Sequence, residues 1–168
     1  MPTIVVDNKL LAKDPVNFDR LNNHAVEELT HLSSLYPEFS RWYESKVYPG
    51  LLVGERKLLL RYHGHSLSGI AIVKDTPAEK KLCCLRILPH MQGTGVGLRL
   101  FQDSFLALQT EKPLLSVSDE HLPEFQRVFQ HFGFEIGNEY PDLYRPRHSE
   151  FSFNGLLDHA ERLVRCAA

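Results

Sequence analysis

The sequence has few cysteines, no long apolar run and little excess charge. Its 168 residues include three cysteines, Cys83, Cys84 and Cys166, and this odd number argues against the disulfide framework of a small secreted domain. No run reaches the roughly 18 apolar residues that a membrane helix needs, and the N-terminus lacks a basic segment followed by an apolar one. The sequence therefore predicts a cytoplasmic protein without a membrane segment.

Charge is nearly balanced, with a formal net charge of −2 and a sequence pI of about 6.5. The strong basic field of most nucleic-acid-binding proteins is therefore missing from the sequence as a whole. A chain of 168 residues, 43% of them hydrophobic, can bury one substantial core and hardly two. We expect one domain over residues 1–168.

Metal-ligand spacing is missing as well. Cys83 and Cys84 lie in a predicted strand, where alternation places neighbouring side chains on opposite faces. His63 and His65 lie in a predicted hairpin turn, and no further Cys or His follows at the spacing of a zinc site. The sequence predicts no metal.

What the sequence does contain is an apolar strand, a glycine loop and a helix in direct succession. The strand ends at Pro89, and Gly93, Gly95 and Gly97 then alternate with other residues. Glycines let backbone N–H groups approach phosphate oxygens, and the free N–H groups at a helix N-terminus favour an anion. The helix that follows carries apolar residues at helical spacing, namely Leu98, Phe101, Phe105 and Leu108. The pattern predicts a pyrophosphate site.

Three kinds of phosphate loop could produce this pattern. A P-loop needs Lys-Ser/Thr after its last glycine, but Gly97 is followed by Leu98 and Arg99, which excludes it. A dinucleotide loop needs an acidic residue about 20 positions on at a strand end, whereas Glu111 lies in a turn before Pro113. The third kind fits: Gln-x-x-Gly-x-Gly at residues 92–97, after Leu-x-Ile-x-Pro, resembles the acetyl-CoA loop of the GNAT superfamily of N-acetyltransferases.

The surrounding sequence extends this resemblance over residues 55–154. A predicted strand at residues 114–118 is followed by a helix that closes on Gly133 and Phe134, as in the GNAT signature, and Gly133 suits the left-handed residue that ends a helix. The resemblance implies an α+β fold with a mixed, mostly antiparallel sheet of about seven strands between helices. It also implies that the fourth and fifth strands splay apart into a V-shaped gap.

The hydropathy pattern agrees with that order of elements. It predicts a strand at residues 3–6, helices at 17–35 and 37–48, and a hairpin of 55–62 and 67–74 turned at His63-Gly64-His65. A third antiparallel strand at residues 80–88 leads into the glycine loop. An apolar stripe over residues 156–164 predicts a final helix that packs on this domain or on a second copy, so a homodimer is one possibility.

In the GNAT fold the arm of acetyl-CoA pairs with the backbone of the strand before the loop. The resemblance places Leu85, Arg86 and Ile87 there, where their peptide groups would bind the arm and polarise the thioester carbonyl. It places the pyrophosphate on the residues that follow, which are Gln92, Gly93, Thr94, Gly95, Val96, Gly97 and Leu98.

Three side chains that many GNAT enzymes use are replaced. Phe129 holds the position of a tyrosine that protonates the leaving thiolate, and phenylalanine cannot donate a proton. Leu122 replaces an asparagine near the start of the same helix, and Lys81 replaces a strand glutamate that serves some members as general base. Acid-base chemistry must therefore lie on other groups, or catalysis is absent.

Two residues are candidates for that chemistry. Asp119, with Ser118, follows the strand after the glycine helix and could deprotonate an ammonium, although an N-cap of the next helix is the alternative. Tyr144, in the connection between the last two strands, could act as the acid, although a surface tyrosine is the alternative. Arg86 shares a strand face with Cys84 and Leu88. It would bind an acidic acceptor, a phosphate or a carboxylate; the alternatives are a pair with a nearby Glu or Asp and a side chain that extends to the rim of the sheet.

The sequence thus predicts an acetyl-CoA-dependent N-acetyltransferase in which an amine attacks the thioester directly in a ternary complex. The acceptor could be a small-molecule amine, a protein amine or an aminoacyl-tRNA, the last being the only nucleic acid expected. The alternative is a non-catalytic acyl-CoA-binding or regulatory module of the same fold, and a third class is a nucleotide-binding regulator.

Overall fold

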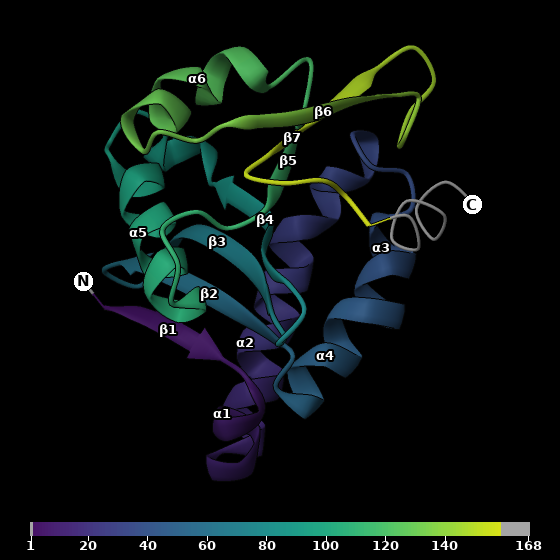
Figure 1. The fold of residues 1–168 in the computed structure, drawn as a ribbon. Helices are drawn as coiled ribbons and strands as arrows, with labels where there is room; N and C mark the ends of the chain where they lie inside the picture. The colour runs from purple at the N-terminus through teal and green to yellow at the C-terminus, as the bar shows by residue number, and fades with distance from the viewer. Residues whose placement is uncertain (1, 159–168) are drawn as a thin grey trace.

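The computed structural model describes residues 2–158. Within that range the strands form two antiparallel sheets, of order β1-β2-β3-β4 and β5-β7-β6 (Figure 1). The first sheet consists of β1 (Thr3–Val6), β2 (Arg56–His63), β3 (Ser66–Asp75) and β4 (Lys80–Ile87). The second consists of β5 (Leu115–Ser118), β6 (Ile136–Pro141) and β7 (Ser149–Phe153). The α+β fold class and the mostly antiparallel sheet are as predicted.

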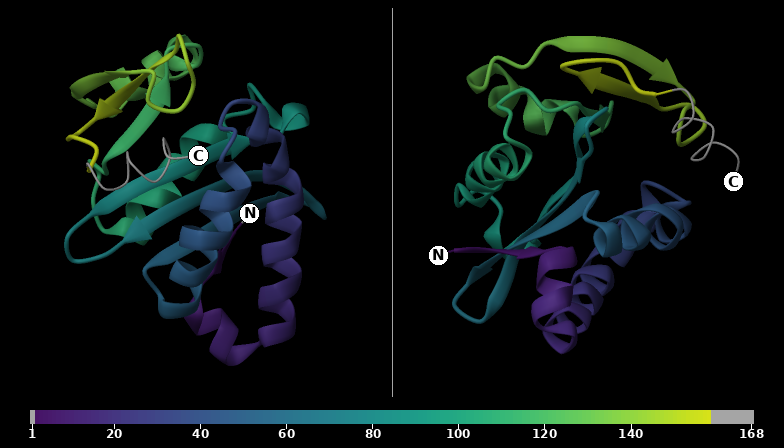
Figure 2. Two further views of the ribbon diagram at one scale, coloured as in Figure 1. Left: turned by 90° about the vertical axis from the view of Figure 1, so that its right-hand side faces the viewer. Right: turned by 60° about the horizontal axis from the view of Figure 1, so that its bottom comes forward.

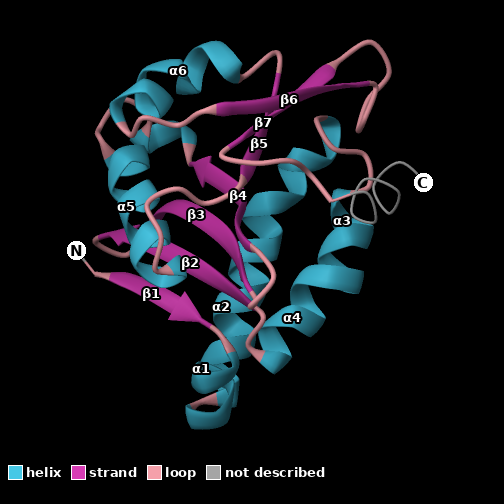
Figure 3. Cartoon of the chain, viewed as in Figure 1, coloured by secondary structure: helices cyan, strands magenta, loops and turns pink. Residues whose placement is uncertain are grey.

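Helices cover both faces of the first sheet (Figures 2 and 3). On one face lie α1 (Asn8–Lys13), α2 (Pro15–Leu29), α3 (Phe39–Trp42) and α4 (Tyr48–Val53), with a 3-10 turn at Thr30–Ser34 and a π-helical turn at Tyr43–Val47. On the other lies α5 (Val96–Leu108), preceded by a 3-10 turn at Pro89–Met91, and α6 (Leu122–His131) covers the second sheet.

Two apolar clusters result from this layering. Alternation along β2 sends Leu58 and Leu60 to the helical cluster formed with α2, α3 and α4, while Leu59 joins the aromatic cluster on the α5 side. The aromatic cluster continues into the second sheet through Phe101, Phe105, Phe129 and Phe153. The sheet is therefore buried on both faces, which explains the near-continuous apolar runs of β2 and β3.

The two sheets meet at one place. Lys81 and Leu114 form a parallel bridge, the Leu82 amide donates to the Leu114 carbonyl at 2.9 Å, and the Leu114 amide donates to the Lys80 carbonyl at 3.0 Å. Beyond this bridge β4 and β5 are not paired within residues 2–158, and the two strands diverge (Figure 1). The predicted gap after the fourth strand is therefore present.

A β-bulge in β4 corrects one prediction. Ile72 pairs with Cys84 and Val73 pairs with Leu82, so Cys83 is an extra residue without a partner in β3. A bulge interrupts the alternation of side chains. Both cysteines consequently pack against the helical cluster, and the prediction that they face opposite sides is wrong.

Two further differences concern helices. The sequence patterns missed α1, which begins at an N-cap aspartate, Asp7, whose side chain accepts from the Lys9 and Leu10 amides. On α5, the apolar residue Leu98 was expected on the buried face but is 36% exposed. The other three predicted residues, Phe101, Phe105 and Leu108, are buried, together with Val96, Leu100 and Ser104.

The predicted C-terminal helix lies largely outside the described residues. Of the predicted segment, residues 156–158 are described and are not helical; Leu157 is buried against Tyr140, and the Leu157 amide donates to the Tyr140 hydroxyl at 3.0 Å. No helix within residues 2–158 is long and apolar enough to span a membrane.

Candidate functional site

The glycine loop lies exposed between β4 and α5. Gly93 and Gly95 have φ angles of 75° and 82°, the left-handed region that favours glycine. A Cβ added at either position would meet nothing within 4 Å, so backbone conformation and not crowding calls for glycine there. The Thr94 hydroxyl donates to the Met91 carbonyl at 2.6 Å and closes the turn.

This loop presents a row of unused backbone donors. Gly95 is the N-cap of α5 and its carbonyl accepts from the Arg99 amide at 3.3 Å. Among the described residues, no backbone hydrogen bond outside the helices and strands uses the amides of residues 93–98. The first turn of α5 also carries no acidic side chain. Free amides at the positive end of a helix dipole form a site for a polyanion.

The open edge of β4 continues from this loop. The Leu88 amide donates to the Ser68 carbonyl at 3.0 Å. In an antiparallel ladder, hydrogen-bonded residue pairs alternate with pairs whose peptide groups point away from each other. The register therefore directs the peptide groups of Arg86 to Ile70 in β3 and those of Leu85 and Ile87 into the gap. Of the three strand residues that the sequence indicated, these two present open N–H and C=O groups to a ligand.

The Arg86 side chain lies on the helical face of the sheet, as the alternation predicted. Cys84 and Leu88, on the same side of the strand, both pack against the helical cluster. The Arg86 Nε is buried and has no hydrogen-bond partner within residues 2–158, and Arg86 makes no ion pair there. The structural ion pair that was one alternative for this residue is therefore not formed with a described carboxylate.

The opposite wall of the gap is formed by β5 and β7. Ser118, at the end of β5, is 5% exposed, and its hydroxyl has no hydrogen-bond partner among the described residues. Glu150 pairs with Ser118 across the β5–β7 ladder and is itself buried, and it accepts a hydrogen bond from the Ser116 hydroxyl at 2.9 Å. This wall is polar and acidic where the β4 wall is mostly apolar.

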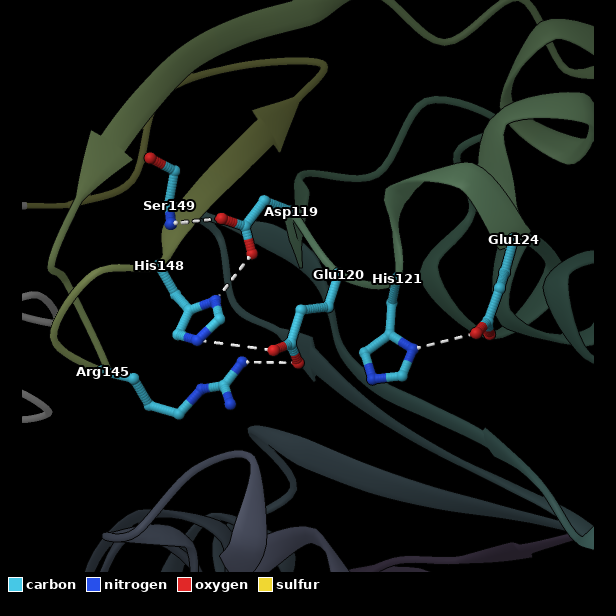
Figure 4. Close-up of polar contacts among 7 residues, drawn as sticks. All are labelled: Asp119, Glu120, His121, Glu124, Arg145, His148 and Ser149. Atoms are coloured by element: carbon cyan, nitrogen blue, oxygen red, sulfur yellow. Dashed lines mark hydrogen bonds and ion pairs between the residues drawn. The ribbon is translucent and has the colours of Figure 1, made fainter.

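Asp119 follows Ser118 and binds the start of β7. Its carboxylate accepts from the Ser149 amide at 3.0 Å and lies 3.1 Å from His148 Nδ1 (Figure 4). These contacts, the Ser149 amide foremost, lower the pKa of Asp119. The N-cap of α6 is His121, so the alternative that Asp119 caps this helix is wrong.

His148 bridges two carboxylates. Its Nε2 lies 3.4 Å from Glu120 Oε1, and Arg145 Nη2 donates to Glu120 Oε2 at 2.9 Å (Figure 4). The arginine lowers the pKa of Glu120. Sequence reasoning did not single out His148 or Glu120, because they belong to segments about 28 residues apart that only the β5–β7 pairing brings together.

Tyr144 lines a small recess beside this network. The recess is shallow and is lined by Tyr36, Ser118, Tyr144, Arg145, His148, Ser149 and Glu150. The Tyr36 and Tyr144 rings meet edge to face with centroids 5.5 Å apart. Of the two candidate catalytic residues, Tyr144 lines the recess, and Asp119 contacts His148, which also lines it.

Of the three residues that replace expected functional groups, Phe129 and Lys81 are buried and Leu122 is half-buried. Phe129 is 4% exposed, and its ring centroid lies 4.5 Å from Phe153 and 6.2 Å from Phe101. Lys81 is 2% exposed at the β4–β5 bridge. Across residues 2–158, no three His, Cys, Asp or Glu side chains gather in a way that could hold a metal ion.

Comparison with solved structures identifies the fold. A protein assigned to the GNAT family of acetyltransferases, from Desulfovibrio desulfuricans, matches 76% of this chain and 87% of its own, with a TM-score of 0.56 and 18% identity. A Bacillus subtilis acetyltransferase in complex with CoA matches 68% of this chain and 86% of its own, with a TM-score of 0.53 and 15% identity.

An Elizabethkingia anophelis GNAT-family acetyltransferase with acetyl-CoA bound matches 66% of this chain and 82% of its own, with a TM-score of 0.53 and 13% identity. No protein-family model matches the sequence, and no curated protein matches it. The chain therefore has the fold of the GNAT acetyltransferases, with little sequence identity to the solved structures.

Proposed function

We propose that this protein is an acetyl-CoA-dependent N-acetyltransferase that transfers an acetyl group to an amine in a ternary complex. The observation that carries the proposal is the row of unused amides at residues 93–98, continuous with the open edge of β4. The amides would hold the pyrophosphate of the cofactor, and the peptide groups of Leu85 and Ile87 would pair with its arm. Neighbours with CoA or acetyl-CoA bound support this cofactor.

The reaction divides into simple steps. A neutral amine attacks the thioester carbonyl, a C–N bond forms, the C–S bond breaks, and the amine loses a proton while the sulfur gains one. A strand N–H group directed at the carbonyl oxygen would stabilise the negative charge that develops there. Holding both reactants in the gap would supply much of the rate, because positioning converts a bimolecular step into an intramolecular one.

The proton for the sulfur requires a donor, and Phe129 cannot serve. Tyr144 is our candidate, because its ring lies in the recess at the end of β5. Asp119 is a weak base, since its lowered pKa reduces its proton affinity. Its place in the reaction would be to orient His148, or to accept the proton of the amine through water.

The test is direct. Purified protein is titrated with CoA and acetyl-CoA by calorimetry, and then incubated with acetyl-CoA and a panel of small amines, N-terminal peptides and aminoacyl-tRNA while free CoA is followed. Micromolar binding together with acceptor-dependent CoA release is the expected result. Binding without release on any acceptor would favour an acyl-CoA-binding module, and preferential binding of NAD or ATP would favour a nucleotide-binding regulator.

A further inference from the structure

Two buried polar groups without partners stand on opposite walls of the gap. The Nε of Arg86 on β4 and the hydroxyl of Ser118 on β5 make no hydrogen bond within residues 2–158. Buried polar groups in folded proteins are almost always satisfied, and the exceptions call for an explanation. Arg86 as a whole is half-buried, and a buried Nε without an acceptor is an unfavourable state that a ligand carboxylate would relieve.

The two groups share one face of the bent sheet. Arg86 alternates with Leu85 and Ile87, which pack on the aromatic cluster, and so points to the opposite, helical side. Ser118 follows Val117, which also packs on the aromatic cluster, and so points to that same opposite side. Both polar groups therefore line the gap from the side of α2, α3 and α4.

Arg86 and Ser118 also lie at about the same distance along their strands from the bridge that joins β4 and β5. Counted from the Lys81–Leu114 bridge, Arg86 is five residues along β4 and Ser118 is four residues along β5. The bulge at Cys83 takes up the one additional residue on β4. The two strands diverge from the bridge, so a ligand between them at this distance from it would meet Arg86 on one wall and Ser118 on the other.

The chemistry of the walls indicates the ligand. A guanidinium only donates hydrogen bonds and binds carboxylate or phosphate oxygens. The other wall carries the carboxylates of Glu150, which lies opposite Ser118 in the β5–β7 ladder, and of Asp119 and Glu120, with Arg145 and His148 beside the last two. A ligand with one carboxylate and one ammonium group could place its carboxylate beside Arg86 and its ammonium group beside these carboxylates.

We propose that Arg86 and Ser118 select an amine acceptor that carries a carboxylate near its amino group, as a free amino acid does. Arg86 binds the carboxylate. Ser118 hydrogen-bonds a polar atom at the amine end, beside the acidic wall. This inference rests on the proposed acetyl transfer and adds the class of acceptor.

The experiment compares matched acceptors. Wild-type protein is assayed for acetyl-CoA-dependent CoA release with the common amino acids, their α-amides and the corresponding decarboxylated amines. At least one free amino acid is expected to exceed its amide by tenfold or more in kcat/KM. Arg86→Gln should remove that preference, and Arg86→Lys should restore only part of it, because lysine keeps the charge but loses the planar fork.

Ser118→Ala should raise the KM for the preferred acceptor several-fold without changing the Kd for CoA. Two controls accompany these variants: Arg41→Gln, which removes an exposed arginine of α3, and Ser104→Ala, which removes a buried hydroxyl that donates to the Leu100 carbonyl. Calorimetry with CoA separates the two proposals. If CoA does not bind, the proposed function fails.

If CoA binds and amides or simple amines are acetylated as well as amino acids, the acceptor assignment is overturned while acetyl transfer stands. The acceptor assignment is equally overturned if CoA binds and no amino acid is acetylated. Should Arg86→Gln fail to fold, the preference of the wild type and the behaviour of Arg86→Lys still decide the question.

Discussion

The two walls of the gap present different chemical groups to a ligand. The β4 wall and its loop offer backbone amides, held by glycines, a bulge and a helix N-terminus. The β5–β7 wall offers side chains, brought together from the segments around residues 118–120 and 144–150. A backbone-built surface suits a ligand that never changes, whereas a side-chain-built surface can be altered one residue at a time. The comparison separates the proposed cofactor wall from the proposed acceptor wall.

The sharpest way to break this comparison is Tyr144→Phe. If Tyr144 protonates the leaving thiolate, losing its hydroxyl should lower kcat by about 10²–10⁴-fold with CoA affinity unchanged. Steady-state kinetics and calorimetry measure the two quantities. Tyr62→Phe is the matched control, because it removes a hydroxyl that contacts His24 on another face. Equal kcat in the wild type and Tyr144→Phe would contradict the role of Tyr144 as the proton donor.

The second prediction concerns the aromatic cluster that supports both walls. Phe129 is 4% exposed among phenylalanine rings, so Phe129→Ala should lower the free energy of unfolding by about 3–5 kcal/mol. Urea denaturation measures it. Leu106→Ala, at a side chain 79% exposed on α5, should stay within about 0.5 kcal/mol of wild type. A small effect at Phe129 would mean that the ring faces the gap and not the core.

Much of the backbone wall could be predicted from the sequence, because its signals are local. Strand β4, Gly93, Gly95 and the apolar periodicity of α5 lie between Lys80 and Leu108, and strand β1 has the predicted bounds. The bulge at Cys83 has no such signal, since it depends on how β4 pairs with both of its neighbours. For the same reason, alternation placed the two cysteines wrongly.

The side-chain wall was less predictable. Asp119 was predicted from its place at a strand end and Tyr144 from its place in the connection between the last two strands, but the contact of Asp119 with His148 depends on the register of β5 against β7. That register is set by packing across the whole second sheet. Ser118 and Glu150 lie opposite one another for the same reason, and no spacing in the sequence indicates that their side chains share a recess.

The backbone wall is tested by Gly95→Asp. The substitution adds a side chain and a negative charge beside the free amides, and it places a residue other than glycine at a φ of 82°. The affinity for CoA should therefore fall at least tenfold, which corresponds to about 1.4 kcal/mol. Gly64→Asp is a close control, because it also has positive φ and open space but lies in the β2–β3 turn. Both variants carry the same backbone strain, so a shared loss of CoA binding would count against the loop.

The smallest expected effect is a pH dependence of stability on the side-chain wall. The pKa of Asp119 is lowered by the Ser149 amide and by His148. A carboxyl whose folded-state pKa is lowered adds stability that is present above its ordinary range, near pH 4, and is lost as pH falls through the folded-state value. Asp119→Asn should therefore lower the Tm at pH 7, and the difference should shrink as the pH falls below about 4. Asp19→Asn, at an exposed aspartate of α2, is the control for the loss of a carboxylate elsewhere on the surface. Thermal melts between pH 3 and 7 measure both variants. A Tm difference between wild type and Asp119→Asn that does not change with pH would show that the contacts of Asp119 to Ser149 and His148 do not depend on its charge.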